Sequence, residues 1–222
     1  MKYFVSSLLS SVKDSFSYYY GVPHVVAIVL TVLLVSSGFD WWYFTFVKTF
    51  YGISYFFLPA IIIGGILPIV LPIIMITIGY IMSKVTVIKT GWMLAQAMIV
   101  SSFICTLYKM FAGRDMPSIH TMIINTSDTF HLGFFEGDLV WGWPASHATI
   151  AFAMAMVIVH MFPTNKRVHL FSMLYALYIS LGVTFSVHWF SDVVAGAILG
   201  AVIGIVVSSK WKSNSHNITL NT

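Results

Sequence analysis

Long apolar runs divide the chain, and they constrain its fold more than any other feature. A membrane-spanning helix needs about 20 mainly apolar residues, and six runs come close to that length. Because 59% of the 222 residues are hydrophobic and only 8% are charged, water cannot be the main solvent. The sequence therefore predicts an all-α, polytopic membrane helix bundle, a single domain over residues 1–222. The expected transmembrane helices, about six in number, cover residues 22–38, 64–83, 91–111, 143–162, 168–187 and 189–209.

A segment rich in aromatic residues separates the first two predicted spans. Tryptophan and tyrosine favour the headgroup region of a bilayer, so we expect residues 40–63 to lie in the membrane interface. A seventh, short span is the alternative, and the prolines and glycines from Pro59 to Pro72 argue against it by dividing the run. The remaining segments are an N-terminus over residues 1–21 and a polar tail over residues 213–222.

The charged residues predict how the chain crosses the membrane. The eleven Lys and Arg residues lie in ones and twos between the apolar runs, a pattern that indicates topology and not a nucleic-acid partner. Cytoplasmic loops carry the excess of Lys and Arg, so both termini are predicted to be cytoplasmic and residues 112–142 to form an extracytoplasmic loop. The small size favours a bacterial inner-membrane protein. If the chain crosses the membrane six times, eight of the Lys and Arg residues lie on the same side of the membrane as the termini: Lys2, Lys13, Lys84, Lys89, Lys166, Arg167, Lys210 and Lys212.

Three groups of polar residues lie near the ends of the later spans. Ionisable side chains are costly to bury there, so those that occur are candidates for function. The groups cover residues 109–117, 143–147 and 188–192. All three are expected at the extracytoplasmic end, although they are far apart in sequence. An added seventh span would invert the sides but keep the groups together, so either topology predicts a single site.

His188 and Asp192 are four residues apart, so on a helix they would share one face. Gly196, Gly200 and Gly204 continue this face, and such a track of small residues packs closely against another helix. The pair is therefore expected to point into the bundle. A carboxylate beside an imidazole fixes its tautomer and stabilises the imidazolium, which makes His188 a candidate nucleophile or base.

The other two groups contribute residue types that suit a phosphate. His147 adds a second imidazole, Lys109 and Arg114 add positive charge, and Ser146 is expected near a helix N-terminus. No carboxylates or thiolates cluster nearby, so no metal or other cofactor is expected. A zinc ion held by His147, His188 and Asp192 stays an alternative.

With these residues in place, the sequence resembles the type 2 phosphatidic acid phosphatase superfamily, which shares its helical core with the vanadium haloperoxidases. The segment from His188 through Trp189 to Asp192 and Gly196 is very similar to the end of the third family motif, and the order of the motifs agrees. The resemblance covers roughly residues 40–205. It implies a phosphatase core formed by the last four spans.

The resemblance also implies roles for single residues. His188 matches the nucleophile that forms a phosphohistidine, and Asp192 matches the carboxylate that orients it. His147 matches the acid that protonates the leaving oxygen, and Lys109 matches a phosphate-binding cation. Arg114 is expected to act as a further phosphate ligand, two residues before the position at which the family has its arginine.

The sequence departs from the family at its phosphate-binding cations. The arginines of the first and third motifs are replaced by Met116 and Gly182, and the Ser and Gly of the second motif by Ala145 and Ser146. Loss of one transition-state donor commonly costs about 10²-fold or more in rate. We therefore expect any difference from the family to concern turnover rate and substrate class more than the fold.

These observations predict a metal-independent lipid phosphatase that acts at the extracytoplasmic face. Phosphatidic acid, phosphatidylglycerol phosphate, a polyprenyl diphosphate and lipid A all suit the predicted site. A phosphotransferase with the same residues is one alternative. A transporter or lipid-binding protein without turnover is another, since the same ionisable groups could bind ions or headgroups.

Overall fold

The protein is described by a computed structural model over residues 2–117, 124–136 and 142–219. Helices dominate this part of the chain, and two short strands pair antiparallel beside them, with Arg114 opposite Phe130. The predicted all-α bundle is confirmed. The elements are α1 Lys2–Ser15, α2 Tyr18–Ser36, α3 Phe39–Lys48, α4 Tyr51–Ile81, α5 Val85–Phe111, β1 Ala112–Arg114, β2 Phe130–Leu132, α6 Ser146–Met161, α7 Lys166–Thr184 and α8 Phe190–Thr219.

Five of the described helices are long and apolar enough to cross a membrane: α2, α4, α5, α7 and α8. The fourth expected span, residues 143–162, forms α6, which has only 16 residues. At a rise of about 1.5 Å per residue, α6 is shorter than the hydrocarbon layer. Its alanine-rich faces are buried among α4, α5, α7 and α8. Its length is therefore set by helix packing more than by the bilayer.

The segment of residues 40–63, which was predicted to lie in the membrane interface, is divided between two helices. Its first part forms α3, but residues 51–63 belong to α4, which continues without interruption through Pro59, Pro68 and Pro72. Prolines are tolerated in membrane helices because neighbouring groups satisfy the freed backbone. At the other end of the chain, α8 runs on to Thr219, into the segment expected as a tail.

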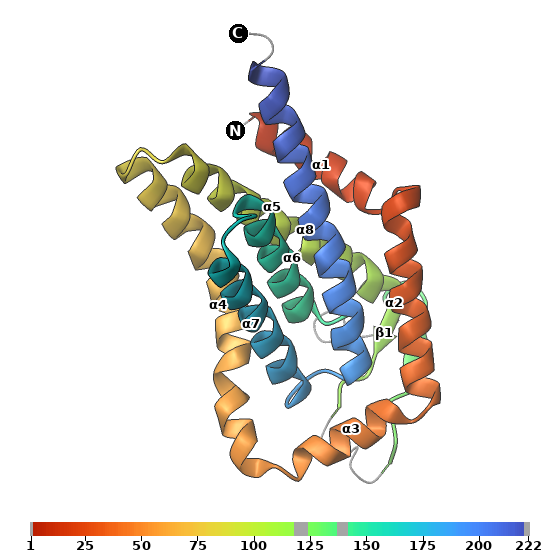
Figure 1. The fold of residues 1–222 in the computed structure, drawn as a ribbon. Helices are drawn as coiled ribbons and strands as arrows, with labels where there is room; N and C mark the ends of the chain where they lie inside the picture. Colours follow the sequence, from red (N-terminus) through yellow and green to blue (C-terminus); the bar gives the residue numbers. More distant parts are fainter. Residues whose placement is uncertain (1, 118–123, 137–141, 220–222) are drawn as a thin grey trace.

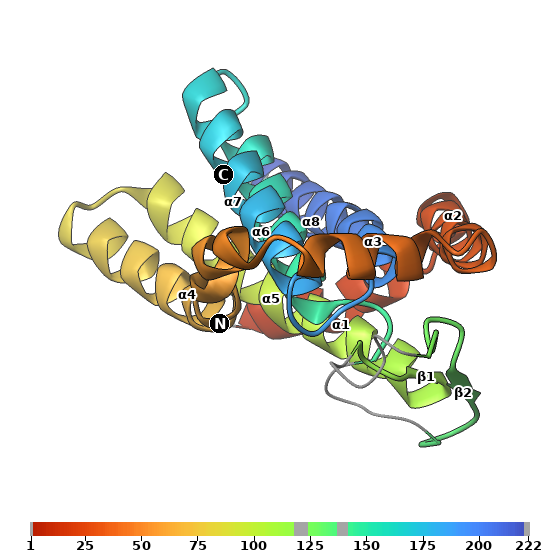
Figure 2. The same ribbon diagram turned by 90° about the horizontal axis from the view of Figure 1, so that it is seen from below.

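The two ends of the bundle carry different features. Figure 1 shows both termini at one end, together with α1 and the turn between α4 and α5. At the opposite end, α3 lies across the bundle between α4 and α2, as the view in Figure 2 makes clear. The turn from α7 to α8, the start of α6 and the strand pair lie at this same end. It is the end at which the three polar groups were expected.

The closest helix contact joins α6 and α8 and uses the predicted glycine track. A Cβ added to Gly196 would lie 2.6 Å from the carbonyl oxygen of Ala145, and one added to Gly200 would overlap the carbonyl oxygen of Thr149. At Gly204 an added Cβ would overlap the carbonyl oxygen of Ala153. The helices thus touch backbone to backbone, as small residues allow in membranes. The packing predicted for this track is confirmed.

This contact makes Gly200 intolerant of a side chain. A Gly200→Ala change should lower the free energy of unfolding in mixed micelles by about 1–3 kcal/mol, the usual cost of overpacking, because a backbone carbonyl cannot move aside. Gly52→Ala is the matched control, since nothing lies within 4 Å of a Cβ there. Equal unfolding curves for the two variants would contradict the contact.

Candidate active site

Backbone and side-chain hydrogen bonds bring the three polar groups together around Asp192. The Ala145 N–H donates to the Asp192 carbonyl oxygen at 3.0 Å, which ties the start of α6 to the first turn of α8. Arg114, at the end of β1, donates to the Asp192 carboxylate at 2.5 Å. His188 lies in the turn just before α8 and faces the same carboxylate. Segments more than 70 residues apart in sequence thus meet at one side chain.

His188 and Asp192 form a buried pair at the start of α8. Nδ1 of His188 is 3.4 Å from Oδ2 of Asp192, and both residues are 1% exposed. The backbone N–H of Trp189 donates to the same carboxylate oxygen at 3.0 Å and fixes its position. A carboxylate at Nδ1 favours the tautomer with a proton on Nδ1, which leaves Nε2 with a free electron pair.

Burial lowers the pKa of the His188 imidazole, because its charged form loses solvation in the protein interior. The hydrogen bond and the negative charge of Asp192 oppose this effect, while the charges of Lys109 and Arg114 add to it. The net direction is downward. His188 is therefore neutral near pH 7, the form in which an imidazole can attack.

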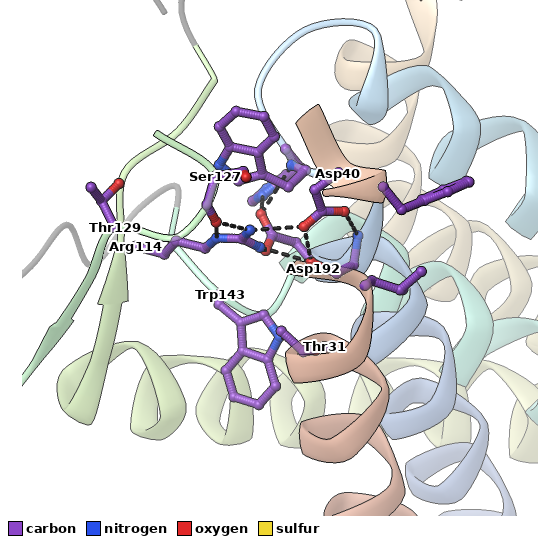
Figure 3. Close-up of polar contacts among 12 residues, drawn as sticks. Thr31, Asp40, Arg114, Ser127, Thr129, Trp143 and Asp192 are labelled. Atoms are coloured by element: carbon purple, nitrogen blue, oxygen red, sulfur yellow. Dashed lines mark hydrogen bonds and ion pairs between the residues drawn. The ribbon is translucent and has the colours of Figure 1, made fainter. Parts of the chain in front are cut away.

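Arg114 is fully enclosed by protein acceptors. Nη1 donates to Asp192 and, at 2.8 Å, to Oγ of Ser191, while Nη2 donates to Asp40 at 2.8 Å. Nε, at 3.1 Å, and Nη2 both donate to the Ser127 carbonyl oxygen. Figure 3 shows the guanidinium between the two carboxylates. All five N–H groups of the guanidinium are thus used, and none is left for a phosphate, which differs from the role expected of Arg114.

Two of the side-chain partners of Arg114 were not among the predicted site residues. Asp40, from α3, is 0% exposed and accepts hydrogen bonds from the N–H and hydroxyl of Ser191 as well as from Arg114. The available signal was an acidic residue next to an apolar run, where unpaired charge is costly. Ser191, between Trp189 and Asp192, gave no signal beyond its position.

The remaining predicted residues lie close to the His188–Asp192 pair. Lys109, in the last turn of α5, is 2% exposed, and its charge acts on both His188 and His147. His147 and Ser146 open α6 and are partly buried. The imidazole of His147 lies against α4, where a Cβ added to Gly64 would come within 3.1 Å of Cδ2.

The structure gives a packing reason for the missing arginine of the third motif. Gly182 lies where α7 crosses α4, and an added Cβ would overlap the Cβ of Ala60. A long side chain has no room there. Met116 differs, because its side chain is 40% exposed. The two positions that lack an arginine therefore differ: Gly182 is enclosed between two helices, whereas Met116 is partly open.

The alternative of a zinc site is not supported by the donor arrangement. Within the part of the chain that the structure describes, no three His, Cys, Asp or Glu side chains are grouped so that they could hold a metal ion. The carboxylates of Asp40 and Asp192 instead accept hydrogen bonds from arginine, serine and backbone donors.

The fold and the site define a helical membrane protein with a buried His–Asp pair beside a lysine and a second histidine. The family model for the PAP2 superfamily matches residues 90–215, more than half of the chain. The chain belongs to the PAP2 superfamily, and this membership indicates phosphatase-type activity on phosphorylated substrates. A search of curated proteins and a search of solved structures each gave no match.

We expect opposite outcomes when an arginine is introduced at each of the two motif positions that lack one. Gly182→Arg should separate α7 from α4 and reduce the yield of folded protein, at a cost above the usual 1–3 kcal/mol of overpacking, so about 3 kcal/mol or more. Met116→Arg should fold within about 0.5 kcal/mol of wild type because its position is partly open. Size-exclusion chromatography and thermal unfolding in detergent measure both. A folded, stable Gly182→Arg variant would contradict this packing argument.

Proposed function

We propose that the protein is a metal-independent lipid phosphatase that works through a phosphohistidine at His188. The observation that carries this proposal is the buried His188–Asp192 pair, with Nδ1 held by the carboxylate and Lys109 close by. The pairing supports a nucleophile at Nε2, because Asp192 stabilises the proton on Nδ1 as the ring gains positive charge.

In the proposed reaction, the two histidines act in turn. Nε2 of His188 attacks phosphorus, and the bond from phosphorus to the leaving oxygen breaks. His147 donates a proton to that oxygen. A water molecule then gives its proton to His147 and attacks the phosphohistidine, which releases phosphate and restores both residues.

The phosphate would be bound by fewer side-chain cations than the family motifs provide. Lys109 supplies one buried positive charge. The start of α6 supplies a second element, because its N-cap is Ala145, which has no side-chain cap, and the first N–H groups of a helix have no acceptor within it. Backbone N–H groups at a helix N-terminus favour anions. Ser146, the first residue of α6, would add a hydroxyl donor.

The place of the site in the bundle favours a lipid substrate. The pair lies at the start of α8, between helices long and apolar enough to span a bilayer. A phosphorylated headgroup could reach it while the hydrocarbon chains stay in the membrane. The distribution of Lys and Arg favours an extracytoplasmic site and cytoplasmic termini in a bacterial inner membrane.

Phosphate release from purified protein tests the proposal. Wild type, in chelator, should release phosphate from at least one of phosphatidic acid, phosphatidylglycerol phosphate, a polyprenyl diphosphate or lipid A. His188→Ala should lower kcat by roughly 10³-fold or more, as loss of a nucleophile does. His169→Ala is the matched control, because this histidine lies in the first turn of α7, at the end of the bundle opposite the site, and contacts the Phe162 carbonyl oxygen.

The same assay separates the alternatives. Equal phosphate release by wild type and His188→Ala on every substrate would reject the phosphatase. Transfer of labelled phosphate to an added lipid or sugar hydroxyl in place of water would identify a phosphotransferase.

The lowered pKa of His188 predicts the acid side of the pH profile. Protonation removes the attacking electron pair, so activity is lost as pH falls through this pKa. Because burial moves the pKa of His188 below the ordinary 6.5, the loss of kcat/KM on acidification should begin only below about pH 6.5. A decline that begins above pH 7 would contradict a neutral, buried His188.

A further inference from the structure

Asp192 belongs to a row of three buried charged residues that extends away from His188. Asp40 is 0% exposed, and Arg114 and Asp192 are each 1% exposed. Each terminal nitrogen of the Arg114 guanidinium holds one carboxylate, Nη1 that of Asp192 and Nη2 that of Asp40. Without water to screen them, these charges fix one another's positions. Figure 3 shows this arrangement.

The two oxygens of Asp192 have separate partners. Oδ1 accepts from Arg114, while Oδ2 accepts from the N–H of Trp189 and faces Nδ1 of His188. The direction in which Asp192 presents Oδ2 to the imidazole therefore depends on where the guanidinium lies. Asp40 is the other charged group that holds this guanidinium.

Asp40 also contacts the helix that carries Asp192. Its Oδ1 accepts the N–H of Ser191 at 2.9 Å, in the first turn of α8, where a negative charge is favourable. Its Oδ2 accepts the Ser191 hydroxyl at 2.5 Å. A single side chain from α3 thus contacts both the arginine and the residue next to Asp192.

We propose that Asp40 is a positioning residue, which sets the geometry of the His188–Asp192 pair through Arg114. This inference rests on the proposed function. It assigns Arg114 to the orientation of Asp192 in place of phosphate binding, and it gives α3 a part in the chemistry. The competing view is that Asp40 merely attaches α3 to the bundle, as the hydrogen bond from Tyr43 to Thr184 and that from Lys48 to the Phe185 carbonyl do.

Asp40→Asn tests the proposal because it keeps the shape of the side chain and removes its charge. Arg114 would then face Asp192 alone and draw it away from His188. We expect kcat for phosphate release to fall about 10- to 100-fold, the range typical of residues that orient a functional side chain from behind, with KM changed less than about threefold. Asp14→Asn is the matched control, since Asp14 pairs with Lys210 at the other end of the bundle, and it should match wild type.

A double-mutant cycle separates positioning from attachment. If Asp40 acts through Arg114, Asp40→Asn should cost nothing further in an Arg114→Gln background, whereas independent attachment of α3 would give multiplied losses. Asp40→Glu, which keeps the charge, should retain more activity than Asp40→Asn. The double variant removes one charge of each sign, so it decides the matter even where Asp40→Asn alone does not fold.

The outcomes distinguish this inference from the proposed function. Wild-type turnover that depends on His188, together with an Asp40→Asn variant equal to wild type or changed only in KM, would overturn the positioning role alone. Multiplied losses in the cycle would do the same. Absence of turnover by wild type on every substrate would overturn both.

Discussion

The backbone contact between α6 and α8 is the constraint on which the site depends. In a bilayer there is no hydrophobic drive to bring helices together, so close contact relies on small residues and complementary shape. Gly196 and Gly200 supply that contact, and the Ala145 N–H can reach the Asp192 carbonyl oxygen only because the helices touch. The start of α6, with His147, is thereby held beside the start of α8, with Asp192. The distance between the two histidines is thus a consequence of helix packing.

The second constraint is that the charged groups of Asp40, Arg114 and Asp192 have almost no access to water. An isolated charge would be costly in such a place, whereas a buried pair is tolerated if its hydrogen bonds are complete. Arg114 meets this condition with two carboxylates, one hydroxyl and one carbonyl oxygen. Loss of either carboxylate would leave one terminal nitrogen of the buried guanidinium without its charged acceptor. The fold of α3 over this end is therefore coupled to the electrostatics of the His188 pair.

Much of the fold follows from the sequence because apolar length and small-residue spacing act locally. The runs that became α2, α5, α7 and α8, and the glycine track, needed no knowledge of neighbouring helices. The inclusion of residues 51–63 in one long helix was not predicted, because the effect of a proline depends on what surrounds the helix, and here α4 continues through Pro59. The pairing of Asp40 with Arg114 was beyond reach for a similar reason. This pairing requires α3 to cross the end of the bundle and β1 to bring Arg114 toward it. No local sequence pattern indicates either arrangement.

The departures from the family motifs have physical explanations that do not require a damaged site. Gly182 allows α7 to pack closely on α4, so an arginine at this position would require a helix to move. Arg114, in sequence the obvious substitute, has its donors occupied by Asp40, Asp192, Ser191 and the Ser127 carbonyl. Positive charge near His188 is thus divided between Lys109 and Arg114, and Arg114 is paired with two carboxylates. A site of this kind would rely on orientation of His188 more than on the number of cations around the phosphate, and orientation is what the contacts of Asp40 and Trp189 provide.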